Sequence, residues 1–112
     1  MLHVPDVDAT ADWYASIGFT ILTKADDGDE TTWASLAFGE TRVMLSVGGT
    51  AGTGKRRDAD LYLTVDDVEE RYQDLRARVE VIEPIYDAFY GMREFIIRDI
   101  NGFWITFGQP IT

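Results

Sequence analysis

The sequence predicts an α+β fold in which two βαβββ repeats form a curved, open mixed sheet around a concave groove, with the helices on the outer face. Val4-Pro5-Asp6-Val7 recurs as Val65-Asp66-Asp67-Val68, and each copy precedes a helical pattern and three strand patterns. A hairpin over 90–109 closes the chain, with Asp99-Ile100-Asn101-Gly102 as its turn, because Asn and Gly tolerate positive φ. One unit cannot bury both faces of its sheet, so two units are expected side by side.

The first repeat, residues 1–47, opens with a short strand, Leu2-His3-Val4. A helix follows through about Ile17, since Asp6 or Asp8 can cap its free amides and Gly18 suits the position after its end. Three strand patterns complete this repeat, with turns at 26–30 and 39–40 between them: Phe19–Lys24, Thr32–Phe38 and Thr41–Val47.

The second repeat, residues 60–109, restarts the pattern after a linking loop over 48–59 that is rich in Gly and Thr and then basic. Leu61–Val65 is the first expected strand, and Asp66-Asp67 precedes an amphipathic helix. Glu80–Ile82 is the next strand, Glu83–Phe89 a loop, and the hairpin follows. The whole chain, 1–112, is expected to be a single domain.

The linking loop contains Gly49-Thr50-Ala51-Gly52-Thr53-Gly54-Lys55, which has the spacing of a phosphate-binding loop. The next residue is Arg56, where that mechanism needs a Ser or Thr hydroxyl for Mg²⁺. A strand follows in place of a helix, so no helix N-terminus would face the phosphate. We therefore do not expect nucleotide binding.

Charge and composition exclude several functions. The 112 residues carry a net charge of −10, which disfavours a nucleic-acid partner and either maintains solubility or attracts a cationic ligand. The absence of cysteine excludes disulfides, thiolate metal sites and a cysteine nucleophile. No apolar run approaches a membrane span, and no basic segment precedes an apolar one at the N-terminus. We expect a soluble, cytoplasmic protein with no membrane partner.

Three stretches resemble the vicinal oxygen chelate superfamily, which includes glyoxalase I, extradiol dioxygenases and bleomycin resistance proteins. They are the opening Val4–Phe19, the second opening Val65–Val68 with its helix, and the hairpin from Tyr90-Gly91 to Phe107-Gly108-Gln109. The hairpin is most similar to the bleomycin-resistance branch. Together the three stretches extend the resemblance over nearly the whole chain.

The resemblance implies four metal-ligand positions, one on each inner strand. The first would fall ahead of Met1, and the others fall near Met44, at Asp60 and at Thr106, where metal-binding relatives carry His and Glu at the last two. Met, Asp and Thr do not make a site for a hard divalent cation. We expect no metal, no cofactor and no metal-dependent catalysis.

Strand alternation from Thr106 predicts which side chains line the groove. Trp104 would face in with Thr106, and pairing across the turn would add Arg93 and Phe95. The same logic at the Gly39-Glu40 turn and in the first and fifth strands completes the expected ligand-binding set: His3, Trp33, Ser35, Arg42, Met44, Asp60, Tyr62, Arg93, Phe95, Trp104 and Thr106.

Two members of this set allow more than one interpretation. His3 is the only histidine and could act as a general base or as a ligand contact. Asp60 could be the counter-ion of a cationic ligand, or it could form an ion pair with Arg42 or Arg93, which we favour. The aromatic members could also simply fill the groove or a dimer interface.

The function predicted is metal-independent binding of a small molecule, of the glyoxalase/bleomycin resistance type. The protein would sequester a drug-like, planar or cationic ligand in an aromatic groove, as in antibiotic resistance. One alternative is a metal-dependent lyase, isomerase or dioxygenase of the same superfamily. Another is a domain for protein association, with a partner filling the groove. The resemblance also implies a homodimer.

Overall fold

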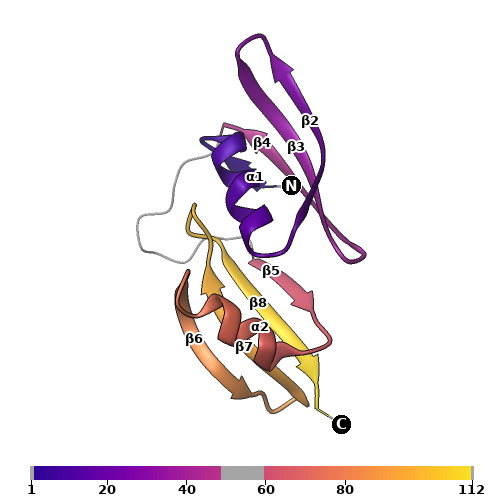
Figure 1. Ribbon diagram of the computed structural model, residues 1–112, viewed down its shortest axis with the longest axis vertical. Coiled ribbons are helices and arrows are strands. Elements are labelled where there is room, and N and C mark those ends of the chain that lie inside the picture. Colours follow the sequence, from indigo (N-terminus) through magenta and orange to yellow (C-terminus); the bar gives the residue numbers. More distant parts are fainter. Residues whose placement is uncertain (1, 49–59, 112) are drawn as a thin grey trace. The chain divides into compact units, whose positions relative to one another are not determined.

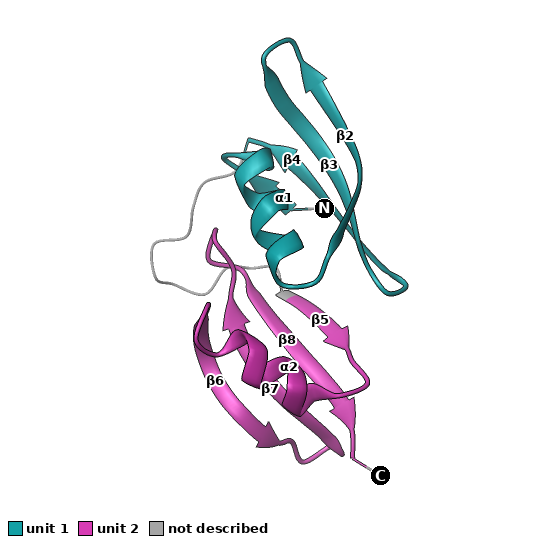
Figure 2. Ribbon diagram, viewed as in Figure 1, with its two compact units in different colours: residues 1–53 teal, residues 54–112 magenta. Residues whose placement is uncertain are grey.

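The computed structural model describes residues 2–48 and 60–111, with only the backbone of Asp60. The chain divides into two compact units, residues 1–53 and 54–112 (Figure 2). Each unit contains one strand-helix-strand-strand-strand repeat, so the predicted α+β class and the βαβββ repeats are confirmed. The phosphate-binding-like stretch 49–55 lies outside the described residues.

The first unit is a four-stranded sheet with one helix across it (Figure 1). Its elements are β1 (Leu2–Val4), α1 (Val7–Ser16), β2 (Thr20–Asp27), β3 (Glu30–Phe38) and β4 (Thr41–Val47). The strand order is β1-β4-β3-β2, and β1 runs parallel to β4 while the other pairs are antiparallel. The predicted bounds of β1 and β4 are confirmed, whereas β2 and β3 extend further into their turn than predicted.

Asp6 caps the N-terminus of helix α1, because its side chain accepts a hydrogen bond from the backbone N–H of Ala9, at 3.0 Å. The helix packs on β2, β3 and β4. Its buried residues meet the apolar face of β3 and β4, and together they form the core of this unit: Val7, Ala11, Tyr14, Ala34, Leu36, Val43 and Leu45.

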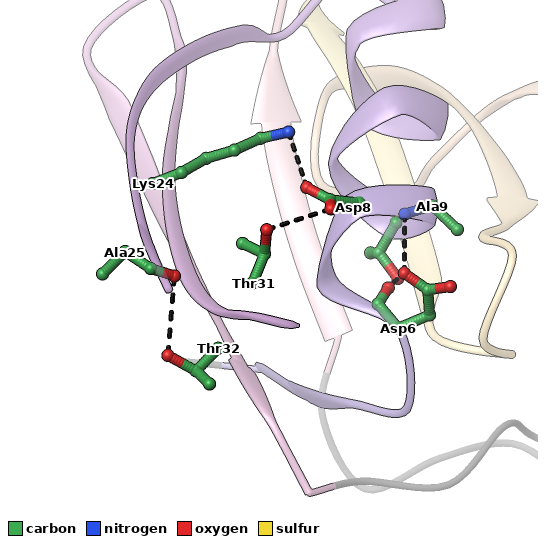
Figure 3. A network of polar contacts seen from close by, with 8 residues as sticks. Asp6, Asp8, Ala9, Lys24, Ala25, Thr31 and Thr32 are labelled. Carbon is green, nitrogen blue, oxygen red and sulfur yellow. Dashed lines mark hydrogen bonds and ion pairs between the residues drawn. The ribbon is translucent and has the colours of Figure 1, made fainter. Parts of the chain in front are cut away.

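A polar network joins the exposed side of α1 to the distal part of the β2–β3 hairpin (Figure 3). Lys24 Nζ donates to Asp8 Oδ1 at 2.7 Å, and Thr31 Oγ1 donates to Asp8 Oδ2 at 2.9 Å. The hydrogen bond from Lys24 is the main cause that lowers the pKa of Asp8. Both charged side chains are solvent-exposed, so water and salt screen the pair and it adds little to stability.

The second unit repeats this arrangement. Its elements are β5 (Asp60–Thr64), α2 (Val68–Leu75), β6 (Glu80–Asp87), β7 (Met92–Arg98) and β8 (Trp104–Pro110), in the order β5-β8-β7-β6. Helix α2 packs on β7 and β8. Asp67 caps it by accepting from Glu70 N at 3.0 Å, and Gln109 Oε1 accepts from Val68 N at 2.9 Å. The end of the hairpin at Gln109 is thereby linked to the N-terminus of the helix that covers it.

The loop predicted over 83–89 is wrong in its first part, because β6 continues to Asp87. Pro84 suggested a break, since proline cannot donate to a ladder. Strand β6 is at the edge of the sheet, where a missing donor is tolerated, and its pairing with β7 shifts register on either side of Glu83.

The pairing around the turn between β7 and β8 differs from the pairing expected from the sequence. Asp99 N donates to Phe103 O at 2.8 Å, so these two residues close the loop and Ile100, Asn101 and Gly102 form it. The Asp99 carboxylate accepts from the backbone N–H groups of Asn101 and Phe103, each at 2.8 Å. Gly102 has a φ of 91°, which favours glycine. Because the loop contains three residues, every residue of β7 is paired one position away from the partner on β8 that the sequence predicted.

Candidate functional site

The sheet of the second unit has one face under α2 and one face away from it. On the helix side, Phe95 stacks on Phe107 and contacts Tyr72 of α2, with ring centroids 5.0 and 5.2 Å apart. Strand residues alternate between faces, so Glu94 and Gly108, which oppose one another, lie on the side away from the helix. We call this side the open face of the second sheet.

Glu94 is the centre of a polar cluster on the open face. Its carboxylate is almost completely buried, with 1% of the residue exposed. Three tyrosine hydroxyls donate to it: Tyr62 to Oε2 at 2.6 Å, Tyr86 to Oε1 at 2.6 Å and Tyr90 to Oε2 at 2.5 Å. Strand β5, strand β6 and the segment before β7 therefore each send one ring to the same carboxylate. We call these four residues the Glu94 cluster.

The cluster holds Glu94 as an anion and the tyrosines as neutral phenols. Burial alone raises the pKa of Glu94, but the three donated hydrogen bonds together outweigh it and lower the pKa below its ordinary value. The pKa of Tyr62 is raised, first by burial and then by its hydrogen bond to Glu94. The hydrogen bond to Glu94 is the main cause that raises the pKa of Tyr86 and Tyr90. At neutral pH the site thus contains one negative charge and three aromatic rings.

Gly108 makes room for the ring of Tyr62. Tyr62 pairs with Thr106 on β8, and its side chain passes over Gly108 to reach Glu94. A Cβ at position 108 would lie 2.1 Å from the Tyr62 hydroxyl oxygen and 2.7 Å from its Cζ. Gly108 is therefore needed for the close approach of a side chain, a use of glycine that is separate from backbone flexibility.

Two predicted site residues are on the other face, which corrects the prediction. Phe95 pairs with Phe107 and is fully buried in the core. Arg93 pairs with Gln109 and forms an ion pair with Asp87, with Nε 2.7 Å from Oδ1. The physical reason is the one-residue difference in the hairpin pairing, because a slip of one residue moves every side chain of a strand to the opposite face.

Trp104, Thr106 and Tyr62 share the open face, as their pairing on β5 and β8 requires. Trp104 and Thr106 are half-buried, and Tyr62 is 45% exposed. Asp60 pairs with Trp104 through its backbone, and its side chain lies outside the described part. The ion pair favoured for Asp60 therefore stays a prediction. Arg93 pairs with Asp87, and Arg42 donates to the carbonyls of Gly39 and Thr41.

The five predicted residues of the first unit lie together on the face of their sheet away from α1. In the strand pairing, His3 and Trp33 lie on either side of Ser46. Ser35 lies opposite Met44, and Arg42 lies opposite Ala37. The phase predicted for β3 and β4 agrees with this register. Met44 is 41% exposed and His3 is also exposed. Their role in binding, and the groove expected between the repeats, stay predictions.

Comparison with known proteins now gives the family. The Glyoxalase/Bleomycin resistance protein/Dioxygenase superfamily matches the chain over residues 1–107. The chain belongs to this superfamily. No curated protein matches it. Among solved structures, TioX from Micromonospora sp. ML1 is 23% identical with a TM-score of 0.76, and the match covers 100% of this chain and 96% of TioX.

Two further structures show how widely this superfamily fold is shared. A protein of unknown function from Agrobacterium tumefaciens str. C58 is 25% identical, with a TM-score of 0.75 over 97% of this chain and 89% of that one. A glyoxalase/bleomycin resistance protein/dioxygenase from Alicyclobacillus acidocaldarius is 14% identical, with a TM-score of 0.77 over 100% and 89% of the two chains. At such identities the likeness concerns the fold.

Two residues at the metal-ligand positions that the resemblance implies, Met44 and Thr106, do not fit a divalent metal. Met44 offers a thioether and Thr106 a hydroxyl, and neither is the carboxylate or imidazole that such a metal prefers. Within residues 2–48 and 61–111, no three His, Cys, Asp or Glu side chains gather in a group that could hold a metal ion. The Glu94 cluster, with Trp104 and Thr106 on the same face, offers aromatic rings, hydroxyls and one buried carboxylate.

Sequence reasoning missed three of the four members of the Glu94 cluster. Tyr62 was in the predicted set, whereas Glu94, Tyr86 and Tyr90 were not. The signal was present in the hairpin, because a pairing shifted by one residue puts Glu94 opposite Gly108 on the face of Tyr62. A charged residue within a strand pattern, paired with a glycine on the next strand, indicates such a contact. The glycine leaves space for a side chain from the strand beyond it to reach the charged group.

Proposed function

We propose that the chain is a metal-independent small-molecule binding protein of the glyoxalase/bleomycin resistance type, which sequesters a planar or cationic ligand on its aromatic surface. One observation carries this proposal. Large side chains stay substantially exposed on the sheet faces away from the helices, with Met44 at 41% and Tyr62 at 45%. Exposed apolar side chains beside fixed polar groups are typical of ligand-binding surfaces.

The direct test is titration calorimetry of the purified protein against bleomycin-class compounds, up to millimolar concentration. Saturable heat with a stoichiometry of one ligand per site would support the drug-binding form of the proposal. The absence of heat at millimolar ligand would contradict it. Tyr62→Ala, which removes an exposed ring, is expected to weaken binding, whereas Leu22→Ala removes an exposed apolar side chain of β2 and serves as the matched control.

Elemental analysis separates this proposal from the metal-dependent enzymes of the superfamily. Protein purified without chelator should contain no stoichiometric divalent metal, because a thioether and a hydroxyl occupy two of the ligand positions. One bound metal per chain, restored after removal by chelator, would favour an enzyme.

The homodimer and the cytoplasmic location remain part of the proposal. None of the helices that the structure describes has the length and apolar content of a membrane span. Light scattering at several protein concentrations tests the dimer, and a mass of one chain at high concentration would contradict it. The net charge of −10 opposes association between copies, so the dimer is expected to strengthen as salt screens that repulsion.

A further inference from the structure

The Glu94 cluster contains a buried negative charge without a positive partner in the described part of the chain. A buried carboxylate is normally paired with a cation or a metal, because removing it from water is costly. Here the groups that bond to Glu94 are three neutral hydroxyls. They keep the carboxylate ionised, but they leave its charge uncompensated.

The same hydroxyls hold aromatic rings at the protein surface. Tyr62 is 45% exposed and Tyr90 is 55% exposed, although the hydroxyl of each is tied to the buried carboxylate. Phe89, fully exposed, packs edge-on against Tyr90 with ring centroids 5.1 Å apart. The exposed rings are therefore fixed in orientation before any ligand arrives, which reduces the entropy that a ligand must overcome.

Charge and rings together favour one class of ligand. The face of an aromatic ring attracts a cation, and a phenol that donates to a carboxylate has a more electron-rich ring. A cation over Tyr62 or Tyr90 would also be attracted by the charge of Glu94 behind the ring. An anion would be repelled, and a neutral apolar ligand would gain nothing from the carboxylate.

We propose that the Glu94 cluster is a subsite for an organic cation, an alkylammonium or quaternary ammonium group, which binds over the exposed rings of Tyr62 and Tyr90 with Glu94 as its buried counter-charge. This inference deepens the proposed function and rests on it, because it assigns one chemical group of the ligand to one place on the open face of the second sheet. The cation stays outside the carboxylate, since Glu94 is 1% exposed.

The other role for the cluster is purely structural, with three hydroxyls satisfying a carboxylate that fixes β5, β6 and β7. A structural role predicts loss of stability when Glu94 is replaced, but no preference for a cation. Binding of a small cation therefore separates the two roles.

The experiment uses choline and its neutral isostere 3,3-dimethylbutan-1-ol, titrated into the full chain and followed by protein NMR. We expect choline to bind about fivefold or more tightly than the isostere, with shifts at Tyr62 and Tyr90. Glu94→Gln keeps the shape of the side chain and should weaken choline binding about fivefold. Glu40→Gln removes one charge from an exposed turn in the other unit and should leave binding unchanged.

Tyr90→Leu is the second variant. It removes an exposed ring, so the fold should tolerate it, and it should also weaken choline binding about fivefold. This variant carries the test if Glu94→Gln does not fold. Equal affinity for choline and the isostere, no shifts with choline, or wild-type choline binding by Tyr90→Leu would each overturn the proposal.

Titration of the same samples with bleomycin-class compounds separates the two proposals. Heat with those compounds but no preference for choline means that the cation subsite fails while the proposed function stands. A choline preference without that heat means that the subsite stands and the drug-binding form of the function fails.

Discussion

Gly108 offers a sharp test of the Glu94 cluster, because one added carbon should displace one ring. The Cβ of Gly108→Ala would lie 2.1 Å from the Tyr62 hydroxyl oxygen, far closer than two such atoms can approach. Tyr62 is 45% exposed, so its ring can swing toward solvent. Its hydrogen bond to Glu94 would then be lost.

The size of this effect follows from two opposing contributions. A hydrogen bond to a charged group stabilises a protein by about 1.5–3 kcal/mol. Replacing Gly by Ala where the backbone permits it stabilises by about 0.4–1 kcal/mol, since the unfolded chain loses conformational freedom. We therefore expect Gly108→Ala to lower the free energy of unfolding by about 1–2 kcal/mol.

Urea denaturation of a double-mutant cycle measures this coupling. In a Tyr62→Ala background the clash is gone, so Gly108→Ala should be neutral or stabilising there. The difference between the two backgrounds should be about 1.5–3 kcal/mol. An equal effect of Gly108→Ala in both backgrounds would refute the reasoning, because Gly108 would then act through its own backbone and not through Tyr62.

Other predictions test the register, the charge and the caps. Phe95→Ala should lower the free energy of unfolding, measured by urea denaturation, by about 3–5 kcal/mol, because its ring is fully buried. Ile96→Ala on the open face should lower it by less, and the reverse order would contradict the pairing. The pKa of Glu94 is lowered on folding, so its contribution to stability is present above an unfolded pKa of about 4.3 and is lost as pH falls through the folded value. Glu94→Gln should therefore flatten the acid limb of stability against pH, and a parallel fall with the wild type would count against this. Asp67→Ala removes the N-cap of α2 and should lower the free energy of unfolding by about 0.5–2 kcal/mol, as measured by urea denaturation. An unchanged free energy of unfolding would argue against that cap. Lys24→Gln should leave the free energy of unfolding nearly unchanged, since the ion pair is exposed, and a large loss would show that Figure 3 depicts a stronger interaction.

The sequence predicted the two halves of the chain unequally, and the turns explain why. At Gly39 the two-residue turn sets the pairing of Leu36 with Val43, so an alternation drawn from the turn gave the right faces. At Asp99 the loop has three residues, and the Asp99 carboxylate that stabilises it does so through backbone groups, which composition does not reveal. One residue of difference then placed Arg93 and Phe95 on the wrong face.

The Glu94 cluster could not be predicted for a second reason, which is long-range convergence. Tyr62 is 32 residues from Glu94 in the sequence, and only the adjacency of β5 to β8 and of β8 to β7 brings them together. The pairing of Tyr86 with Glu94 depends on β6 continuing to Asp87, which the presence of Pro84 argued against. Local sequence patterns predicted most helices and strands, but the Glu94 cluster could be predicted only from the way in which the strands pair.

The irregular outer strands of the two sheets have a consequence for colloidal behaviour. The edge strand β6 contains Pro84 and two register shifts, and β2, at the edge of the other sheet, also shifts its register twice. The opposite strands, β1 and β5, are short. An incoming strand would find no long, regular row of free backbone donors and acceptors. The folded protein should therefore resist edge-to-edge aggregation by geometry as well as by charge, and so stay in solution at high salt, where its negative charges no longer repel.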